Sequence, residues 1–361
     1  MGLTAGATAA GARVALGRAS LLAGWVPLLA VVPVALLAPE LPPTYRYLPL
    51  VASAVLFGMP HGAVDYVALP RARTGRVDVC GVVVVAALYL LLGGAYLALW
   101  FTAPVPAAVL FILLTWFHWG QGDLYALRDL FGTDHVGDRV QAALTVVVRG
   151  GAPMLVPLVG FPDRYRAVVG TFVEPFGASA GAWWVFERTP RLVLGGAFAA
   201  VTGLALARGY RRARSAAGSG TDDSTRWSLR QSALRGWGLD AAETGLLWAY
   251  FLLVPPVLAI GVYFCLWHSV RHIARVVLLD GRNVDALARR RWLPAAERFA
   301  LEAAVPTALA LALVGALWVA VPDSVGSLAG ATGLYLVGVA VLTLPHTAVV
   351  VWLDREQGIW A

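Results

Sequence analysis

The chain has 361 residues, of which 59% are hydrophobic and only 14% are charged, and its formal net charge is +7. A mean hydropathy of +0.71 exceeds what a water-soluble domain of this length needs, so the composition excludes an ordinary soluble enzyme and predicts a polytopic membrane protein. The basic residues gather in the connectors between apolar stretches, which indicates membrane topology and not nucleic-acid binding.

The elements are expected in chain order as follows. Residues 1–19 are small, weakly basic and without a signal-peptide cleavage pattern, and are predicted to be a cytoplasmic tail. Membrane-spanning helices need roughly 20 mostly apolar residues. The stretches that meet this condition are 20–38, 46–69, 79–101, 107–127, 140–160, 191–207, 256–279, 299–321 and 328–353. The fold class is therefore predicted to be an all-α bundle of about eight to ten membrane segments.

Arg-rich connectors at 71–76, 208–214 and 281–292 place the N-terminus and these loops in the cytoplasm by the positive-inside rule. Residues 208–240 are predicted to be a cytoplasmic loop, with a mobile polar part at 215–235. The chain must then cross once more before the next helix, so a short or tilted helix is expected within 241–255, ended by Pro255-Pro256.

Segment 161–190 contains Pro, Gly and the pair Trp183-Trp184, which suits an interfacial stretch. The same topology makes the helices over 46–69, 107–127 and 256–279 run in one direction, from outside to inside.

Four histidines are predicted to lie at similar depth in these parallel helices: His61, His118, His268 and His272. Ionisable residues at membrane depth are costly and usually functional. His268 and His272 are four residues apart, so both imidazoles can meet one ion from the same helix face. With two ligands from other helices they predict a central metal site, and imidazole suits Fe, Cu, Zn and Ni.

Three further residues are expected to support that site. Asp65 follows His61 by four residues and Asp123 follows His118 by five, so both are candidates to accept a hydrogen bond from a ligating imidazole. His346 is expected deeper toward the cytoplasm, in a supporting or structural role.

His135 lies in a polar loop and is expected to be solvated. Nearby aromatic side chains, among them Trp119 and Phe264, are expected to line a tunnel for a long apolar substrate.

The blocks PHGAVD (60–65), FHWGQGD (117–123), WHSVRH (267–272) and PHTAVVVWLD (345–354) resemble the signature blocks of the Brp/Blh family of microbial membrane β-carotene 15,15′-dioxygenases. The resemblance implies one transmembrane carotenoid-cleaving domain over 1–361. It implies oxidative cleavage of all-trans-β-carotene with O₂ into two all-trans-retinals. It also implies a non-haem Fe(II) held by four histidines, which map onto the catalytic metal ligands His61, His118, His268 and His272.

The implied setting is a multi-pass protein of the cell membrane with a functional link to a retinal-binding rhodopsin. Three alternatives stay open on the residues alone. A di-iron desaturase uses more histidine boxes than this chain has, and a haem carrier needs facing axial histidine pairs. A proton-coupled transporter would rely on a His/Asp relay.

Overall fold

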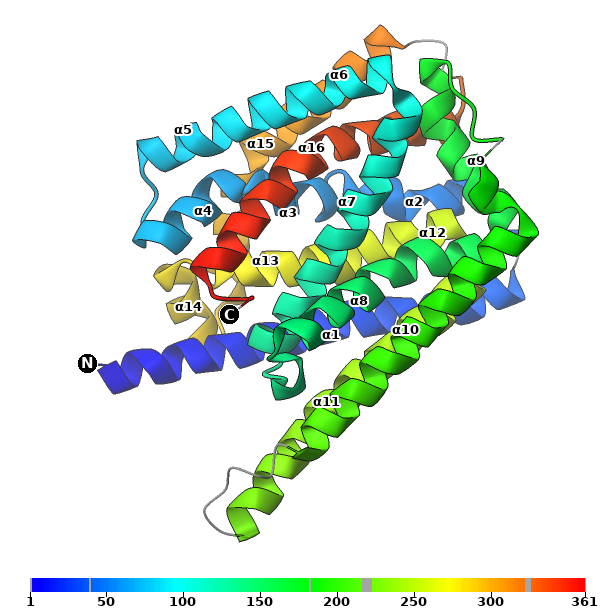
Figure 1. The fold of residues 1–361 in the computed structure, drawn as a ribbon. Coiled ribbons are helices and arrows are strands. Elements are labelled where there is room, and N and C mark those ends of the chain that lie inside the picture. The colour runs from blue at the N-terminus through cyan, green and yellow to red at the C-terminus, as the bar shows by residue number, and fades with distance from the viewer. Residues whose placement is uncertain (1, 39, 182, 216–222, 322–325, 361) are drawn as a thin grey trace.

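The computed structural model describes the whole chain except residues 1, 39, 182, 216–222, 322–325 and 361. The described residues form a helical bundle and contain no β-strand (Figure 1). The predicted all-α class is therefore confirmed.

The α-helices in chain order are α1 (Gly2–Leu37), α2 (Pro43–Ser53), α3 (Gly58–Ala63), α4 (Asp65–Thr74), α5 (Val79–Leu88), α6 (Gly94–Thr102), α7 (Pro104–Tyr125), α8 (Arg139–Gly160), α9 (Pro162–Val173), α10 (Arg188–Ser215), α11 (Asp223–Leu253), α12 (Pro256–Val262), α13 (Ser269–Val277), α14 (Gly281–Ala288), α15 (Trp292–Ala320) and α16 (Leu328–Glu356). The π-helical turns η1 (Tyr89–Gly93), η2 (Ala126–Leu130) and η7 (Tyr263–His268) continue α5, α7 and α12, and 3₁₀ turns occur at η3 (Asp134–Val136), η4 (Glu174–Phe176) and η5 (Trp184–Phe186).

In the part of the chain that the structure describes, nine helical segments are long and apolar enough to cross a membrane. They are Thr8–Leu37, Pro43–Thr74, Val79–Thr102, Pro104–Leu130, Arg139–Gly160, Arg188–Ser215, Pro256–Val277, Trp292–Ala320 and Leu328–Glu356. Each coincides with one predicted stretch, so the chain is a polytopic membrane protein. Several of these segments are built from two helices joined by a break or a π-helical turn, which the hydropathy pattern does not indicate.

The region after α10 differs from the prediction. Most of the polar stretch expected to be a loop is helical, because α10 continues to Ser215 and α11 begins at Asp223. The expected short helix within 241–255 is the end of α11, which is 31 residues long. The break at Pro255-Pro256 is confirmed, since α11 ends at Leu253 and α12 begins at Pro256. Helices α10 and α11 form an antiparallel hairpin along one side of the bundle (Figure 1).

The two other irregular regions also contain helix. The predicted tail at 1–19 is the beginning of α1, and its cytoplasmic side stays a prediction. The predicted interfacial stretch contains α9, followed by the 3₁₀ turns η4 and η5. Its place relative to the bilayer likewise stays a prediction.

The histidine-bearing helices occupy the middle of the bundle. The α2–α4, α7, α12–α13 and α16 segments all run from right to left in Figure 1, which agrees with the predicted parallel arrangement. In the span Pro256–Val277, 72% of the apolar 18-residue stretch is buried inside the bundle. The corresponding share is 17% in the outer spans Val79–Thr102 and Trp292–Ala320. The helix that contributes two histidines is therefore a central element.

Candidate metal centre

Five histidines meet in the interior of the bundle, and we refer to them as the histidine cluster: His61, His118, His268, His272 and His346. His61 lies near the end of the short α3, and His118 lies in the second half of α7. His268 ends the π-helical turn η7 and His272 follows on α13, while His346 comes from α16. All five side chains are buried.

The ring separations show that the four predicted histidines come together. The His61 ring centroid lies 5.2 Å from that of His268 and 5.3 Å from that of His272. The His118 ring centroid is 4.7 Å from that of His268. The predicted juxtaposition of these imidazoles is therefore found in the fold.

His346 belongs to the same cluster. Its ring centroid is 4.6 Å from that of His118, 4.9 Å from that of His61 and 5.0 Å from that of His272. The expectation that His346 lies apart from the other four was wrong, since its ring lies among theirs. Its depth relative to the cytoplasmic side stays a prediction.

Several ring nitrogens of the histidine cluster are buried without a hydrogen-bond partner. They are His61 Nε2, His118 Nδ1, both nitrogens of His272, and His346 Nε2. Buried polar atoms are nearly always paired, because leaving one unpaired costs the full desolvation of that group. A cluster of buried imidazoles with unpaired nitrogens could therefore hold a bound group, and imidazole nitrogen is a common ligand of transition metals.

Two spacings fit a metal ion. His268 Nε2 and His118 Nε2 are 3.0 Å apart, and two nitrogens about 2.1 Å from one ion at right angles have about this separation. One ligand atom each from His61, His118 and His346 lie within 4.8 Å of one another. The same holds for Asp65, His272 and His346. The residues present thus form a donor set that fits a metal such as iron.

Local backbone features bring these rings together. A Cβ atom on Gly122 would lie 3.2 Å from His268 Cε1, and a Cβ on Gly62 would lie 3.3 Å from His346 Nδ1. The absence of side chains at these two positions therefore makes room for the imidazoles. The π-helical turn η7 ends at His268, and such turns occur frequently at functional sites.

The two predicted supporting carboxylates have different surroundings. Asp65 Oδ2 accepts hydrogen bonds from His346 Nδ1 at 2.8 Å and from Tyr89 Oη at 2.7 Å. Its histidine partner is His346 and not His61, because α3 ends before Asp65 and α4 begins at it. His61 Nδ1 instead lies in hydrogen-bond contact with the Gly58 carbonyl.

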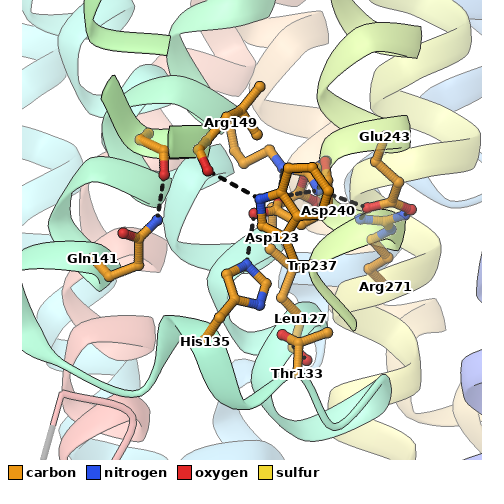
Figure 2. A network of polar contacts seen from close by, with 12 residues as sticks. Asp123, Leu127, Thr133, His135, Gln141, Arg149, Trp237, Asp240, Glu243 and Arg271 are labelled. Atoms are coloured by element: carbon orange, nitrogen blue, oxygen red, sulfur yellow. Dashed lines mark hydrogen bonds and ion pairs between the residues drawn. The ribbon is translucent and has the colours of Figure 1, made fainter. Parts of the chain in front are cut away.

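Asp123 belongs to a second buried group, which we call the ionic cluster: Asp123, Arg149, Asp240, Glu243 and Arg271 (Figure 2). Arg271 Nη1 is 2.9 Å from Asp123 Oδ1, and Arg271 also pairs with Glu243. Arg149 Nη2 is 2.7 Å from Asp240 Oδ1 and 3.0 Å from Glu243 Oε2. Asp123 thus contacts guanidinium groups, and its predicted support of an imidazole stays untested.

The ionic cluster fixes the helices that bear the histidines. Trp267, which precedes His268, donates from Nε1 to Asp123 Oδ1 at 3.0 Å and stacks with Arg271, whose Cζ is 3.9 Å from the ring centroid. This joins α7 to η7 and α13. Farther along, Asp354 of α16 pairs with Arg275 at 2.8 Å and accepts from Gln121 Nε2 at 2.6 Å. Helices α7, α13 and α16 are therefore locked together beside the site.

His135 also differs from its prediction. It was expected to be solvated, but it is 2% exposed and its Nε2 lies 2.9 Å from Asp240 Oδ2 (Figure 2). The α10–α11 hairpin covers it, because Arg212 Nε of α10 donates to its carbonyl at 2.9 Å and Asp240 comes from α11. His135 is thus a partner of the ionic cluster and does not join the histidine cluster.

An apolar cavity of about 780 Å³ opens beside the histidine cluster. His61, His118 and His346 form part of its wall. Trp119 and Phe264, which were expected to line a tunnel, form part of the cavity wall. The remaining wall is mostly aliphatic, with side chains from α5, η1, α9, α15 and α16 among others, so the cavity offers a largely apolar surface.

The chain is similar to known proteins over most of its length. A model of the β-carotene 15,15′-dioxygenase family matches residues 52–354. The chain belongs to this family. One relative is named "Probable beta-carotene 15,15'-dioxygenase Blh" and comes from Halobacterium salinarum. It is 53% identical to this chain over 348 residues, which cover 96% of this chain and 96% of the relative.

A second relative, "Probable beta-carotene 15,15'-dioxygenase Brp" from the same species, is 34% identical over 319 residues, which cover 85% of this chain and 83% of the relative. No solved structure matches the chain. All five histidines of the cluster lie inside the range that the β-carotene 15,15′-dioxygenase family shares with this chain.

Proposed function

We propose that this protein cleaves all-trans-β-carotene at its central 15,15′ double bond with O₂, giving two all-trans-retinals at a non-haem Fe(II). The proposed ligands are His61, His118, His268 and His272. The observation that supports this most strongly is the set of unpaired buried imidazole nitrogens beside a large apolar cavity. The family match favours this function over the desaturase, haem-carrier and transporter alternatives.

The cavity suits such a substrate. Its volume of about 780 Å³ lies within the range of small-molecule sites. A carotene has no hydrogen-bonding group, so apolar walls can pack against it without leaving any polar group unpaired. Leu90 and Leu309 both line the cavity and are 77% and 66% exposed on the outer face of the bundle. A substrate dissolved in the bilayer can therefore reach the cavity without passing through water.

The chain's own part in the reaction is to bind and orient. The overall change breaks one C=C bond and the O=O bond of O₂ and forms two C=O bonds, so no proton needs to be gained or lost. Bound iron would supply the redox chemistry of oxygen. The apolar walls would hold the central double bond next to the histidines and exclude water, and such positioning accounts for a large share of many enzymatic rates.

We also propose the setting of the reaction. The N-terminus and the Arg-rich connectors at 71–76, 208–214 and 281–292 lie in the cytoplasm, and the protein resides in the cell membrane. The bilayer supplies the carotene. The retinal product suits a retinal-binding rhodopsin as its recipient, and no nucleic-acid partner is expected.

Expression in cells that accumulate β-carotene tests the activity. The expected result is loss of orange colour together with appearance of retinal, and each alanine variant at His61, His118, His268 and His272 should stay orange. With ¹⁸O₂ both retinals should carry label, provided that exchange with solvent is controlled. Retinal from an alanine variant at the wild-type rate would remove that histidine from the ligand set. Absence of retinal from the folded wild-type protein would reject the proposed function.

A further inference from the structure

We propose that His346 is a fifth imidazole ligand of the metal centre, and that Asp65 and Tyr89 set its tautomer. This inference rests on the proposed function, because it needs a metal in the histidine cluster. It extends the four-histidine set that the sequence blocks imply, since His346 was expected only to support that set from a deeper position.

The position of His346 is that of a ligand. Its ring centroid lies within 4.6–5.0 Å of those of His118, His61 and His272. His61 and His118 have ring centroids 6.3 Å apart, so His346 is closer to both of them than they are to each other. One nitrogen from each of these three histidines lies within 4.8 Å of the other two. An ion held by His61 and His118 would therefore meet His346 as well.

The hydrogen bonds of His346 leave the lone pair of its ring on Nε2, where a metal could bind. Asp65 Oδ2 lies 2.8 Å from His346 Nδ1 and also accepts from Tyr89 Oη at 2.7 Å. A carboxylate can only accept, so Nδ1 carries the proton and the lone pair is on Nε2. His346 Nε2 is buried and without a hydrogen-bond partner. This is the carboxylate–histidine arrangement that orients metal-ligating imidazoles and raises their basicity.

The ordinary alternative is a structural histidine that joins α16 to α4. Such a residue explains the bond from Nδ1 to Asp65 but leaves Nε2 buried and unpaired, which native interiors rarely tolerate. A metal ligand accounts for the unpaired Nε2 as well as for the bond to Asp65.

Titration of purified apoprotein with Co²⁺ tests the inference through binding instead of turnover. His346→Gln should weaken Co²⁺ binding by at least tenfold and alter the visible spectrum of the bound ion. Asp65→Asn and Tyr89→Phe act through His346, and the former should weaken binding roughly 10–100-fold, as is usual for carboxylates behind ligating histidines. Tyr89→Phe should have the smallest effect, because Asp65 keeps its bond to His346.

Thr347→Val is the matched control. Thr347 neighbours His346 on α16, is buried, and its hydroxyl has no hydrogen-bond partner, so the substitution keeps the volume and removes no polar contact. Its Co²⁺ affinity and spectrum should equal those of the wild type. If His346→Gln fails to fold, the Co²⁺ affinity of Asp65→Asn tests the inference instead. Asp65→Asn is the milder substitution, because it replaces one oxygen of the side chain by an amino group.

The outcomes separate this inference from the proposed function. If wild-type protein binds Co²⁺ and both His346→Gln and Asp65→Asn bind it with unchanged affinity and spectrum, His346 is structural and the inference is overturned. If wild-type protein binds neither Co²⁺ nor Fe²⁺, the metal-dependent function itself fails. Weaker binding in both variants, with normal binding in Thr347→Val, supports a fifth ligand.

Discussion

The histidine cluster and the ionic cluster lie side by side in the same bundle and satisfy their polar groups in opposite ways. Every charge of the ionic cluster faces an opposite charge, as for Arg271 between Asp123 and Glu243. In the histidine cluster, nitrogens of His61, His118, His272 and His346 are unpaired. The charges of the first cluster are paired within the chain, which points to a role in stability, whereas the unpaired nitrogens of the second fit the bound metal that we propose.

The largest expected effect on stability follows from breaking the ionic cluster. Arg271→Met removes the guanidinium from two buried carboxylates, and leaving buried charge without its partner typically costs about 3–5 kcal/mol. Unfolding of the purified protein in detergent should show this loss. The matched control is Arg282→Met, because Arg282 also pairs with an aspartate, Asp280 at 3.2 Å, but is 70% exposed, so that its loss should cost only about 0–1 kcal/mol. Equal destabilisation by both variants would contradict the assigned role.

A substitution in the histidine cluster should show the reverse pattern. His272→Ala removes an imidazole whose two nitrogens have no hydrogen-bond partner, so the metal-free protein should lose only about 1–2 kcal/mol of stability, an ordinary value for one substitution. Iron content and retinal formation should be lost. If His272→Ala lowers the stability of the metal-free protein as much as Arg271→Met does, the proposed difference between the two clusters is contradicted.

A smaller effect is expected where a glycine makes room for an imidazole. In Gly122→Ala the new Cβ would lie 3.2 Å from His268 Cε1, so the ring must shift by a few tenths of an ångström. Retinal formation should fall by roughly tenfold, because misplacement by about 1 Å can cost 100-fold. Gly245→Ala is the control, since a Cβ there would meet no atom within 4 Å other than the adjoining backbone of its own helix. Unchanged rates in both proteins would mean that the position of His268 is not critical.

The smallest effect concerns Asp138, which caps α8 and lies outside the membrane segments. Hydrogen bonding from Arg208 lowers the pKa of Asp138 to about 2. A lowered native pKa means that the carboxylate stabilises the fold above pH 4 and loses this contribution as the pH falls toward 2. Asp138→Asn should therefore be less stable than wild type by under about 1 kcal/mol near pH 6, with the difference disappearing near pH 2. A difference that grows on acidification would contradict this pairing.

The sequence predicted the membrane segments and four members of the histidine cluster for physical reasons. Apolar length alone defines a span, and the spacing of His268 and His272 defines one helix face. The place of His346 was missed because depth was inferred from position within an apolar stretch. The partner of Asp65 was missed because the boundary between α3 and α4 removes the regular helical spacing on which the prediction relied.

The α10–α11 hairpin was missed for another reason. The first part of α11 is polar and has no apolar stretch of membrane length, so its helical state depends on tertiary contact with α10. Trp237 of α11, for example, donates from Nε1 to the Leu206 carbonyl of α10 at 3.0 Å (Figure 2). The burial of His135 follows from the same hairpin, and local sequence holds no signal for it. The block PHTAVVVWLD, which places a histidine in the fourth signature block, was the feature that could have indicated His346.

The most direct test of the central claim is the iron content of purified wild-type protein compared with His118→Ala, both shown to be folded by size-exclusion chromatography in detergent. We predict a single iron per chain without haem in the wild type, and none in His118→Ala. Retinal-forming protein without metal, or equal iron in the two proteins, would contradict the assignment of the histidine cluster as the metal centre.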